Sequence, residues 1–287
     1  MHPIVFRFPE ALPILGGEAV TSFGVFMLLA FLTAGFALRA EMSRGGYDPD
    51  KAWDFIFMAV IGGILGGKIY YVLLNFPRLQ QEGLSFVLQR SGMVWYGGFL
   101  GATALCVWEV YRSKLDLGRV ADYVAAPLAI AYAVGRIGCF MVGDDWGRPT
   151  SLPWGVRFPL GSPPTRVDII EREFGIAVDP ELIERYGQIV PVHPTQLYEV
   201  ALSTLIFLVL WRIRRHRHRA GWLFMMWLMM AGAERLLVEF FRAKDDRFFG
   251  ILTLAQILSM ALITVGFLGA LRMRVAASAK PAAASGA

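Results

Sequence analysis

Charged residues are scarce in this chain of 287 residues. Asp, Glu, Lys and Arg together make up only 18% of it, whereas a soluble domain carries roughly 25%. Hydrophobic residues make up 56%. This imbalance argues against a soluble domain and indicates that lipid surrounds much of the protein.

Cysteine and histidine are also scarce. The two cysteines, Cys106 and Cys139, lie in apolar segments, so a disulfide framework is not indicated. His216 and His218 lie in an arginine-rich loop, which is more typical of a solvated surface near lipid headgroups than of a metal site. We expect no metal and no cofactor. The net charge of +5 fits membrane-loop Lys and Arg better than nucleic-acid binding.

Long apolar segments dominate the rest of the chain. Each is long enough, or nearly so, to cross a bilayer as a helix. They cover roughly residues 19–38, 53–75, 93–111, 121–142, 196–211, 221–241 and 250–271. The predicted fold class is therefore an all-α polytopic membrane protein with about seven transmembrane helices. We expect one transmembrane domain over residues 1–275 and a disordered tail over 276–287.

The distribution of Lys and Arg predicts the orientation. The loops at 39–52, 112–120 and 212–220 and the tail contain 14 such residues, against six in the short segments of the opposite side. By the positive-inside rule, the N-terminus lies outside the cell and the C-terminus inside. The long segment at about 143–195 is then an extracytoplasmic insertion between the fourth and fifth helices. Its first part should be irregular, and its alternating second part can form short helices.

Among the ionisable residues inside or at the ends of the predicted spans, we single out four: Lys68, Arg136, Arg235 and Glu239. Each is costly in hydrocarbon unless it is paired or wetted. Arg235 and Glu239 are four residues apart and can pair on one helix face, which leaves open a purely structural role. The topology puts three of them, with Trp95 to Gly98 and His193, near the outer face. Two arginines in a low-dielectric site suit a phosphate, so a phospholipid headgroup is the expected ligand.

One stretch resembles a known family. Residues 135–150 and the following Leu152-Pro153-Trp154-Gly155 resemble the signature of the prolipoprotein diacylglyceryl transferases. Similar motifs occur in the same order at residues 95–101, 193–199 and 234–242, and the start at Phe8-Pro9-Glu10 is also similar. The resemblance extends from about residue 8 to 270.

The resemblance implies a monomeric bacterial inner-membrane enzyme with a single catalytic domain. It would transfer the diacylglyceryl group of phosphatidylglycerol to the lipobox cysteine of a prelipoprotein, forming a thioether and releasing glycerol phosphate. The catalytic residues are expected to be Tyr96, Arg136, Asp144, Arg235 and Glu239. The residues expected to bind phosphatidylglycerol are Gly97, Gly98, Arg136, Cys139, Gly147, His193, Tyr198 and Arg235.

Four positions depart from the family pattern. Tyr96 stands where many members have a histidine, Cys139 replaces a frequent asparagine, Asp144 a glutamate, and Phe23 a tyrosine. Tyrosine is a poor base because its pKa is about 10, so Asp144 or His193 can take the thiol proton instead. Asp144 and His193 can equally be structural, as loop cap and helix anchor, and Cys139 and the paired glycines can be packing residues.

The sequence is also compatible with two other functions. A divergent family member would act on a different lipid or protein. A transporter or flippase for an anionic lipid would also contain buried arginines, but it predicts a site near the midplane and repeated halves. The sequence shows no repeat.

Overall fold

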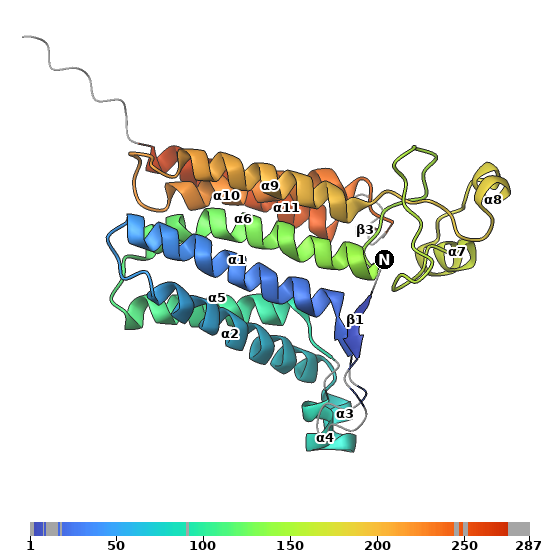
Figure 1. The fold of residues 1–287 in the computed structure, drawn as a ribbon. Coiled ribbons are helices and arrows are strands. Elements are labelled where there is room, and N and C mark those ends of the chain that lie inside the picture. The colour runs from blue at the N-terminus through green and yellow to red at the C-terminus, as the bar shows by residue number, and fades with distance from the viewer. Residues whose placement is uncertain are drawn as a thin grey trace, which may run out of the picture.

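The structure is a computed structural model that describes residues 3–7, 9, 17, 19–89, 92–243, 247–248 and 252–274. Within these ranges, seven helices have 18 or more residues and run side by side in one bundle (Figure 1). They are α1 (Ser22–Arg44), α2 (Lys51–Leu74), α5 (Trp95–Arg112), α6 (Leu117–Val142), α9 (Thr195–Ile213), α10 (Trp222–Glu239) and α11 (Leu254–Met273). Consecutive members of this set are antiparallel.

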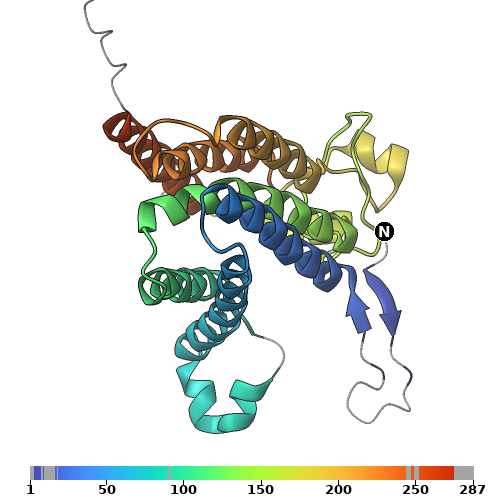
Figure 2. The same ribbon diagram turned by 60° about the vertical axis from the view of Figure 1, so that its left-hand side comes forward.

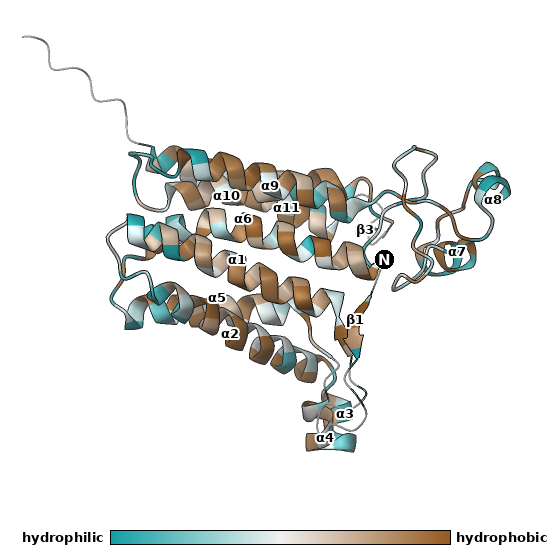
Figure 3. Cartoon of the chain, viewed as in Figure 1, coloured by the Kyte–Doolittle hydropathy of each residue, from teal (hydrophilic) through white to brown (hydrophobic). Residues whose placement is uncertain are grey.

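Hydrophobic residues dominate along the length of the bundle, and hydrophilic residues gather at its ends (Figure 3). Five helices, α1, α2, α6, α9 and α11, are long and apolar enough to cross a membrane. The two remaining predicted spans correspond to α5 and α10, which do not meet that criterion. Three charged residues interrupt α10: Glu234, Arg235 and Glu239. The structure therefore supports a multi-span membrane protein.

The bundle has two parts. Helices α1, α6, α9, α10 and α11 pack in series, while α2 pairs with α5 and touches the rest mainly through α1. Glycines let α2 and α5 approach closely. A Cβ added at Gly66 would lie 2.9 Å from the Cα of Gly101, and one at Gly101 would lie at the same distance from Gly66. Gly66 and Gly101 thus serve the packing of α2 against α5.

The two ends of the bundle differ (Figures 1 and 2). The end at which α1, α5 and α9 finish has only short connections, and we call it the arginine end. The opposite end, which we call the site end, holds every smaller element. These are β1 (Ile4–Arg7) paired with β2 (Ala19–Thr21), α3 (Phe76–Glu82), α4 (Leu84–Leu88), α7 (Val167–Phe174), α8 (Pro180–Tyr186), and β3 (Arg247–Phe248) paired with β4 (Leu252–Thr253).

Residues 143–194, between α6 and α9, contain α7 and α8, in agreement with the predicted short helices. This segment has an apolar core to which Ala243, from beyond α10, also contributes. Its own members are Trp146, Phe158, Val167, Ile170, Val178, Leu182, Val190 and Val192. Isolated β-bridges tie its first part to its last part, at Pro149 with Val192 and Val156 with Val192. The segment is thus ordered and fixed to the site end. The tail at 276–287, with Phe8 and Glu10 of the N-terminal motif, lies outside the described residues.

Candidate functional site

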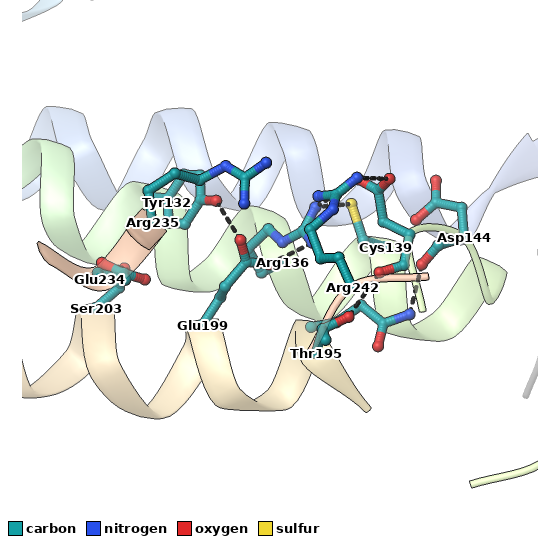
Figure 4. Close-up of polar contacts among 12 residues, drawn as sticks. Tyr132, Arg136, Cys139, Asp144, Thr195, Glu199, Ser203, Glu234, Arg235 and Arg242 are labelled. Carbon is teal, nitrogen blue, oxygen red and sulfur yellow. Dashed lines mark hydrogen bonds and ion pairs between the residues drawn. The ribbon is translucent and has the colours of Figure 1, made fainter. Parts of the chain in front are cut away.

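Helices α6 and α9 bring two buried opposite charges into contact. Arg136 in α6 is 8% exposed and Glu199 in α9 is 1% exposed. The Nη2 atom of Arg136 forms an ion pair with Glu199. The hydroxyl of Tyr132, one turn before Arg136, donates to Glu199 at 2.9 Å. Figure 4 shows these side chains pointing toward one another between the two helices. A buried charge of this kind is tolerated because it is paired and hydrogen-bonded.

The end of α6 adds a second carboxylate to Arg136. The helix stops at Gly143, which adopts the left-handed conformation, and the chain turns so that Asp145 faces the bundle. Asp145 accepts from Arg136 at 3.1 Å and from Arg242 at 2.9 Å. The first residues of α9 hold this turn: Thr195 donates to the carbonyl of Asp145 at 2.6 Å, and Gln196 donates to that of Asp144.

Helix α10 completes the site. Arg235 pairs with Glu239 at 2.5 Å, as the spacing of four predicted, and Arg242 lies 3.7 Å from the same carboxylate. Ion pairs therefore link six residues, which we call the charge network: Arg136, Asp145, Glu199, Arg235, Glu239 and Arg242. Three guanidinium groups meet three carboxylates at the site end of the bundle.

Two members of the charge network are accessible. The side chain of Arg235 is 29% exposed and that of Asp145 is 43% exposed, whereas Glu199 and Glu239 are almost fully buried. Arg235 has a single carboxylate partner among the described residues. An anion that approaches from the surface therefore meets guanidinium groups whose positions are already fixed by buried carboxylates.

Gly147 lies where three segments cross. Its amide donates to the carbonyl of His193 at 2.8 Å, and it forms a β-bridge with Arg242. An added Cβ would lie 2.8 Å from the Cβ of His193 and 2.9 Å from the Cγ2 of Thr195, with the carbonyl of Phe241 closer still. Only glycine fits without displacing its neighbours, which gives a physical reason for a required glycine at this position.

Aromatic side chains border the site, and we call His193, Tyr198 and Phe241 the aromatic wall. The Nδ1 atom of His193 lies 3.0 Å from the hydroxyl of Tyr198, which accepts from the indole of Trp154 at 2.8 Å. The ring centroids of His193 and Phe241 are 5.2 Å apart. His193 thus contacts an aromatic side chain from α9 and one from the end of α10, beside the charge network.

The two adjacent aspartates have opposite pKa shifts. Burial raises the pKa of Asp144, and the neighbouring charge of Asp145 adds to this rise. Burial also acts to raise the pKa of Asp145, but Arg242 and Arg136 more than offset it, so its pKa lies below the usual value. Burial lowers the pKa of His193. Asp144 therefore takes up a proton more readily than an ordinary aspartate, whereas Asp145 keeps its charge to lower pH.

The structure brings together most of the residues expected in the site. Arg136, Arg235 and Glu239 belong to the charge network, and Asp144, Gly147, His193 and Tyr198 surround it. Cys139 is buried and its sulfur accepts from Arg136 at 3.3 Å. Phe23 is on α1, which packs against Gly138 of α6.

The glycine–tyrosine motif of α5 is not joined to the charge network. The hydroxyl of Tyr96 makes no hydrogen bond to any described residue; its ring packs on Trp95, with centroids 5.2 Å apart. Gly97 and Gly98 face α2, where a Cβ on Gly98 would lie 3.1 Å from the carbonyl of Gly63. These contacts favour the packing role for both glycines. Lys68 lies apart as well, and donates to the carbonyl of Gln89 at 2.5 Å.

The sequence analysis does not predict several polar residues of the site. Asp145, Glu199 and Arg242 lie inside the recognised motifs, but no binding role is expected for them from the sequence. Glu234 precedes Arg235 and is buried, and the hydroxyl of Ser203 lies 2.6 Å and 2.8 Å from its two carboxylate oxygens. A carboxylate within an apolar span was the available signal for Glu199 and Glu234. Among the described residues, no group of His, Cys, Asp and Glu is arranged to hold a metal ion.

The fold and the site together define a polytopic membrane protein with a preorganised arginine–carboxylate network at one end of its bundle. Comparisons with known proteins are more specific. The model of the prolipoprotein diacylglyceryl transferase family matches residues 9–272. The chain belongs to this family.

Curated relatives agree over nearly the full length. A phosphatidylglycerol–prolipoprotein diacylglyceryl transferase of Sodalis glossinidius is 32% identical over 277 residues, which covers 90% of this chain and 92% of that protein. The transferase of the same name from Photobacterium profundum is 32% identical and covers 96% of both chains. That from Stenotrophomonas maltophilia is 34% identical over 266 residues, 88% of this chain and 87% of its own.

Proposed function

We propose that this protein transfers the diacylglyceryl group of phosphatidylglycerol to the lipobox cysteine of a prelipoprotein, the first step of bacterial lipoprotein maturation. Membership of the transferase family supports this reaction. The observation that carries it from the structure is the charge network, in which three guanidinium groups converge at the site end. Such a network suits a substrate whose reacting bond ends in a phosphate.

The topology that fits this function has seven spans in the inner membrane, with the N-terminus outside and the C-terminus inside. The seven long helices and the excess of Lys and Arg at the arginine end support it. In this orientation the site end faces the extracytoplasmic surface, where a prelipoprotein emerges. The segment at 143–194 then covers the site from outside. We further propose that the protein acts as a monomer.

The reaction is a displacement at the glycerol carbon that bears the phosphate. A carbon–sulfur bond forms to the cysteine of the prelipoprotein, and the carbon–oxygen bond to phosphate breaks. The electron pair of that bond leaves with glycerol phosphate, and the thiol proton passes to a base. A free thiol has a pKa near 8.5, so acceleration requires both a base and cations for the leaving group.

Arg136 and Arg235 bind the phosphate and stabilise the charge that develops on it. Glu199 and Glu239 orient these two guanidinium groups, because each carboxylate is almost fully buried and paired with one of them. Asp145, which is partly exposed, accepts hydrogen bonds from the guanidinium groups of Arg136 and Arg242 before the substrate binds. The phosphate of the substrate then replaces Asp145 as the acceptor. Removing Arg136 leaves the buried Glu199 without its ion-pair partner, and removing Glu239 does the same to Arg235.

Asp144 accepts the thiol proton. One of its carboxylate oxygens, Oδ1, is buried without a hydrogen-bond partner among the described residues, and its raised pKa makes it more basic than an ordinary aspartate. Tyr96 has a different role in the lipid path or in helix packing, since no hydrogen bond links it to the charge network. His193 and Tyr198 form the aromatic wall beside the lipid.

Complementation of a strain depleted of its transferase tests the proposal. The wild-type gene should restore growth, and Arg136→Ala or Arg235→Ala should not, although the variant proteins remain in the membrane. Growth with either variant would contradict the phosphate-binding role.

A double variant separates chemistry from structure. Breaking a buried pair by removing one partner costs about 3–5 kcal/mol, while removing both charges avoids that penalty. Arg136→Gln with Glu199→Gln should therefore regain the thermal stability lost in Arg136→Gln but remain inactive. Recovery of activity in the double variant would reduce the pair to a structural contact.

A further inference from the structure

The arginine end contains a second basic site, far along the bundle from the charge network. A cavity of about 420 Å³ lies at the end of α9 and is lined by Leu208, Trp211, Arg212, Arg214 and Arg215. Its volume is within the roughly 300–1,000 Å³ of small-molecule sites. Three guanidinium groups and two large apolar side chains therefore share one opening.

One of the three arginines is fixed by the protein itself. The guanidinium of Arg214 stacks on the ring of Trp211, 3.7 Å from its centroid. Its Nε atom lies 3.0 Å from the carboxylate of Glu41 in α1, which is 2% exposed, and Nη1 donates to the carbonyl of Trp211 at 2.8 Å. Arg214 thus ties α9 to α1 and holds the rim of the cavity in place.

The other two arginines have no such partner. Arg212 and Arg215 are exposed, and their side chains form no ion pair or hydrogen bond with the described part of the chain. Nearby acids do not neutralise them, because Glu41 is already paired with Arg44 and Arg214. Two cations thus remain available in a cavity whose third cation is neutralised.

The apolar wall distinguishes a lipid from a small anion. Leu205, Leu208 and Arg212 are spaced by three and four residues, so they follow one face of α9, and Arg215 lies in the turn just after the helix. Leu205 and Leu208 are each 56% exposed and lie toward the middle of the bundle from the arginines. An acyl chain can follow these leucines while its phosphate reaches the arginines, and Trp211 is typical of the membrane interface.

We propose that this cavity binds the headgroup phosphate of an anionic phospholipid in the leaflet at the arginine end. This lipid is separate from the one that reacts at the site end. Its binding holds the end of α9 at the depth of the headgroups. Basic pockets beside transmembrane helices bind anionic headgroups by the same chemistry.

Equilibrium binding tests the proposal. The probe is phosphatidylserine labelled on an acyl chain, titrated into the purified full-length protein in a neutral detergent and followed by fluorescence anisotropy. A direct hydrogen bond from each guanidinium to the phosphate contributes about 1 kcal/mol, so Arg212→Gln with Arg215→Gln should weaken binding roughly 30-fold. The matched control is Arg217→Gln with Arg219→Gln, which removes two exposed arginines of the same loop outside the cavity and should change binding less than threefold.

A phospholipid and a free phosphate ion, as alternative ligands of this cavity, would give different results in this assay. Inorganic phosphate at millimolar concentration should not displace the labelled lipid, and labelled phosphatidylcholine should bind at least tenfold more weakly. Displacement by phosphate would assign the cavity to a free anion and overturn the lipid proposal. Equal weakening by the two double variants would show a diffuse positive surface, and would overturn it too. Transfer activity at the site end is measured in parallel, and it should persist in both variants.

Discussion

Replacing Gly147 with alanine tests how tightly the charge network is positioned. Ordinary van der Waals contact begins at 3.4 Å, but the added Cβ would lie 2.8 Å from the Cβ of His193 and nearer to the carbonyl of Phe241. The backbone on one side must therefore retreat by about 0.6 Å or more. Asp145 and Arg242 flank this crossing, so their ion pair moves with it.

The expected consequence is a loss of rate rather than of fold. A displacement of about 1 Å can reduce catalysis by about 10²-fold, and catalytic groups need positions within about 0.5 Å. We therefore expect Gly147→Ala to lower kcat/KM for diacylglyceryl transfer by about 100-fold. The assay measures lipidation of a lipobox peptide in phosphatidylglycerol micelles, alongside thermal unfolding of the purified protein.

A glycine next to Arg136 provides the control. Gly135 lies within α6, and an added Cβ there would meet nothing within 4 Å. Gly135→Ala should keep full activity and gain up to about 1 kcal/mol of stability, because alanine is the better helix former. Activity of Gly147→Ala within twofold of wild type would refute the positioning argument, and so would an equal loss in Gly135→Ala.

Three further predictions concern separate parts of the molecule. Tyr96→Phe should retain activity within tenfold in the transfer assay, because its hydroxyl makes no hydrogen bond to the described residues; a loss of 1,000-fold would make Tyr96 the base. Burial raises the pKa of Asp144, so its carboxylate is protonated at a higher pH than that of an ordinary aspartate. We expect kcat/KM to fall as the pH is lowered through this raised pKa. Asp144→Asn should abolish this acid limb and cost about 10²–10⁴-fold in rate, and an unchanged pH profile would exclude the role. Gly66→Ala should destabilise the α2–α5 pair by about 1–3 kcal/mol, since its Cβ would lie 2.9 Å from the Cα of Gly101. Gly63→Ala meets nothing within 4 Å and, like Gly135→Ala, should melt at or slightly above the temperature of the wild type.

The sequence was most informative about structural features that depend on residues close together in the chain. A helix must satisfy its own backbone in lipid, so the long apolar segments predicted both ends of each long helix to within about six residues. The spacing of Arg235 and Glu239 predicted their pair, because residues four apart share a helix face. The two short helices of the segment at 143–194 also followed from local periodicity.

Contacts between distant segments could not be predicted in the same way. The pairing of Arg136 with Glu199 depends on how α6 and α9 pack, and the position of Asp145 depends on the left-handed turn at Gly143. The carboxylates of Glu199 and Asp145 both belong to the recognised motifs, but a linear sequence pattern does not identify the residue with which each one pairs. Conversely, Tyr96 shares the same end of the bundle by topology, yet its helix belongs to the α2–α5 pair and forms no hydrogen bond with the charge network.

The most direct test of the central claim is the stoichiometry of the reaction in a purified system. The protein is incubated with a lipobox peptide and phosphatidylglycerol that carries a label in its glycerol phosphate, and both products are measured together. The account predicts one labelled glycerol phosphate for each thioether-linked peptide with the wild type, and neither product with Arg136→Gln. Absence of the lipidated peptide with the folded wild-type protein, or its undiminished formation by Arg136→Gln, would contradict the account.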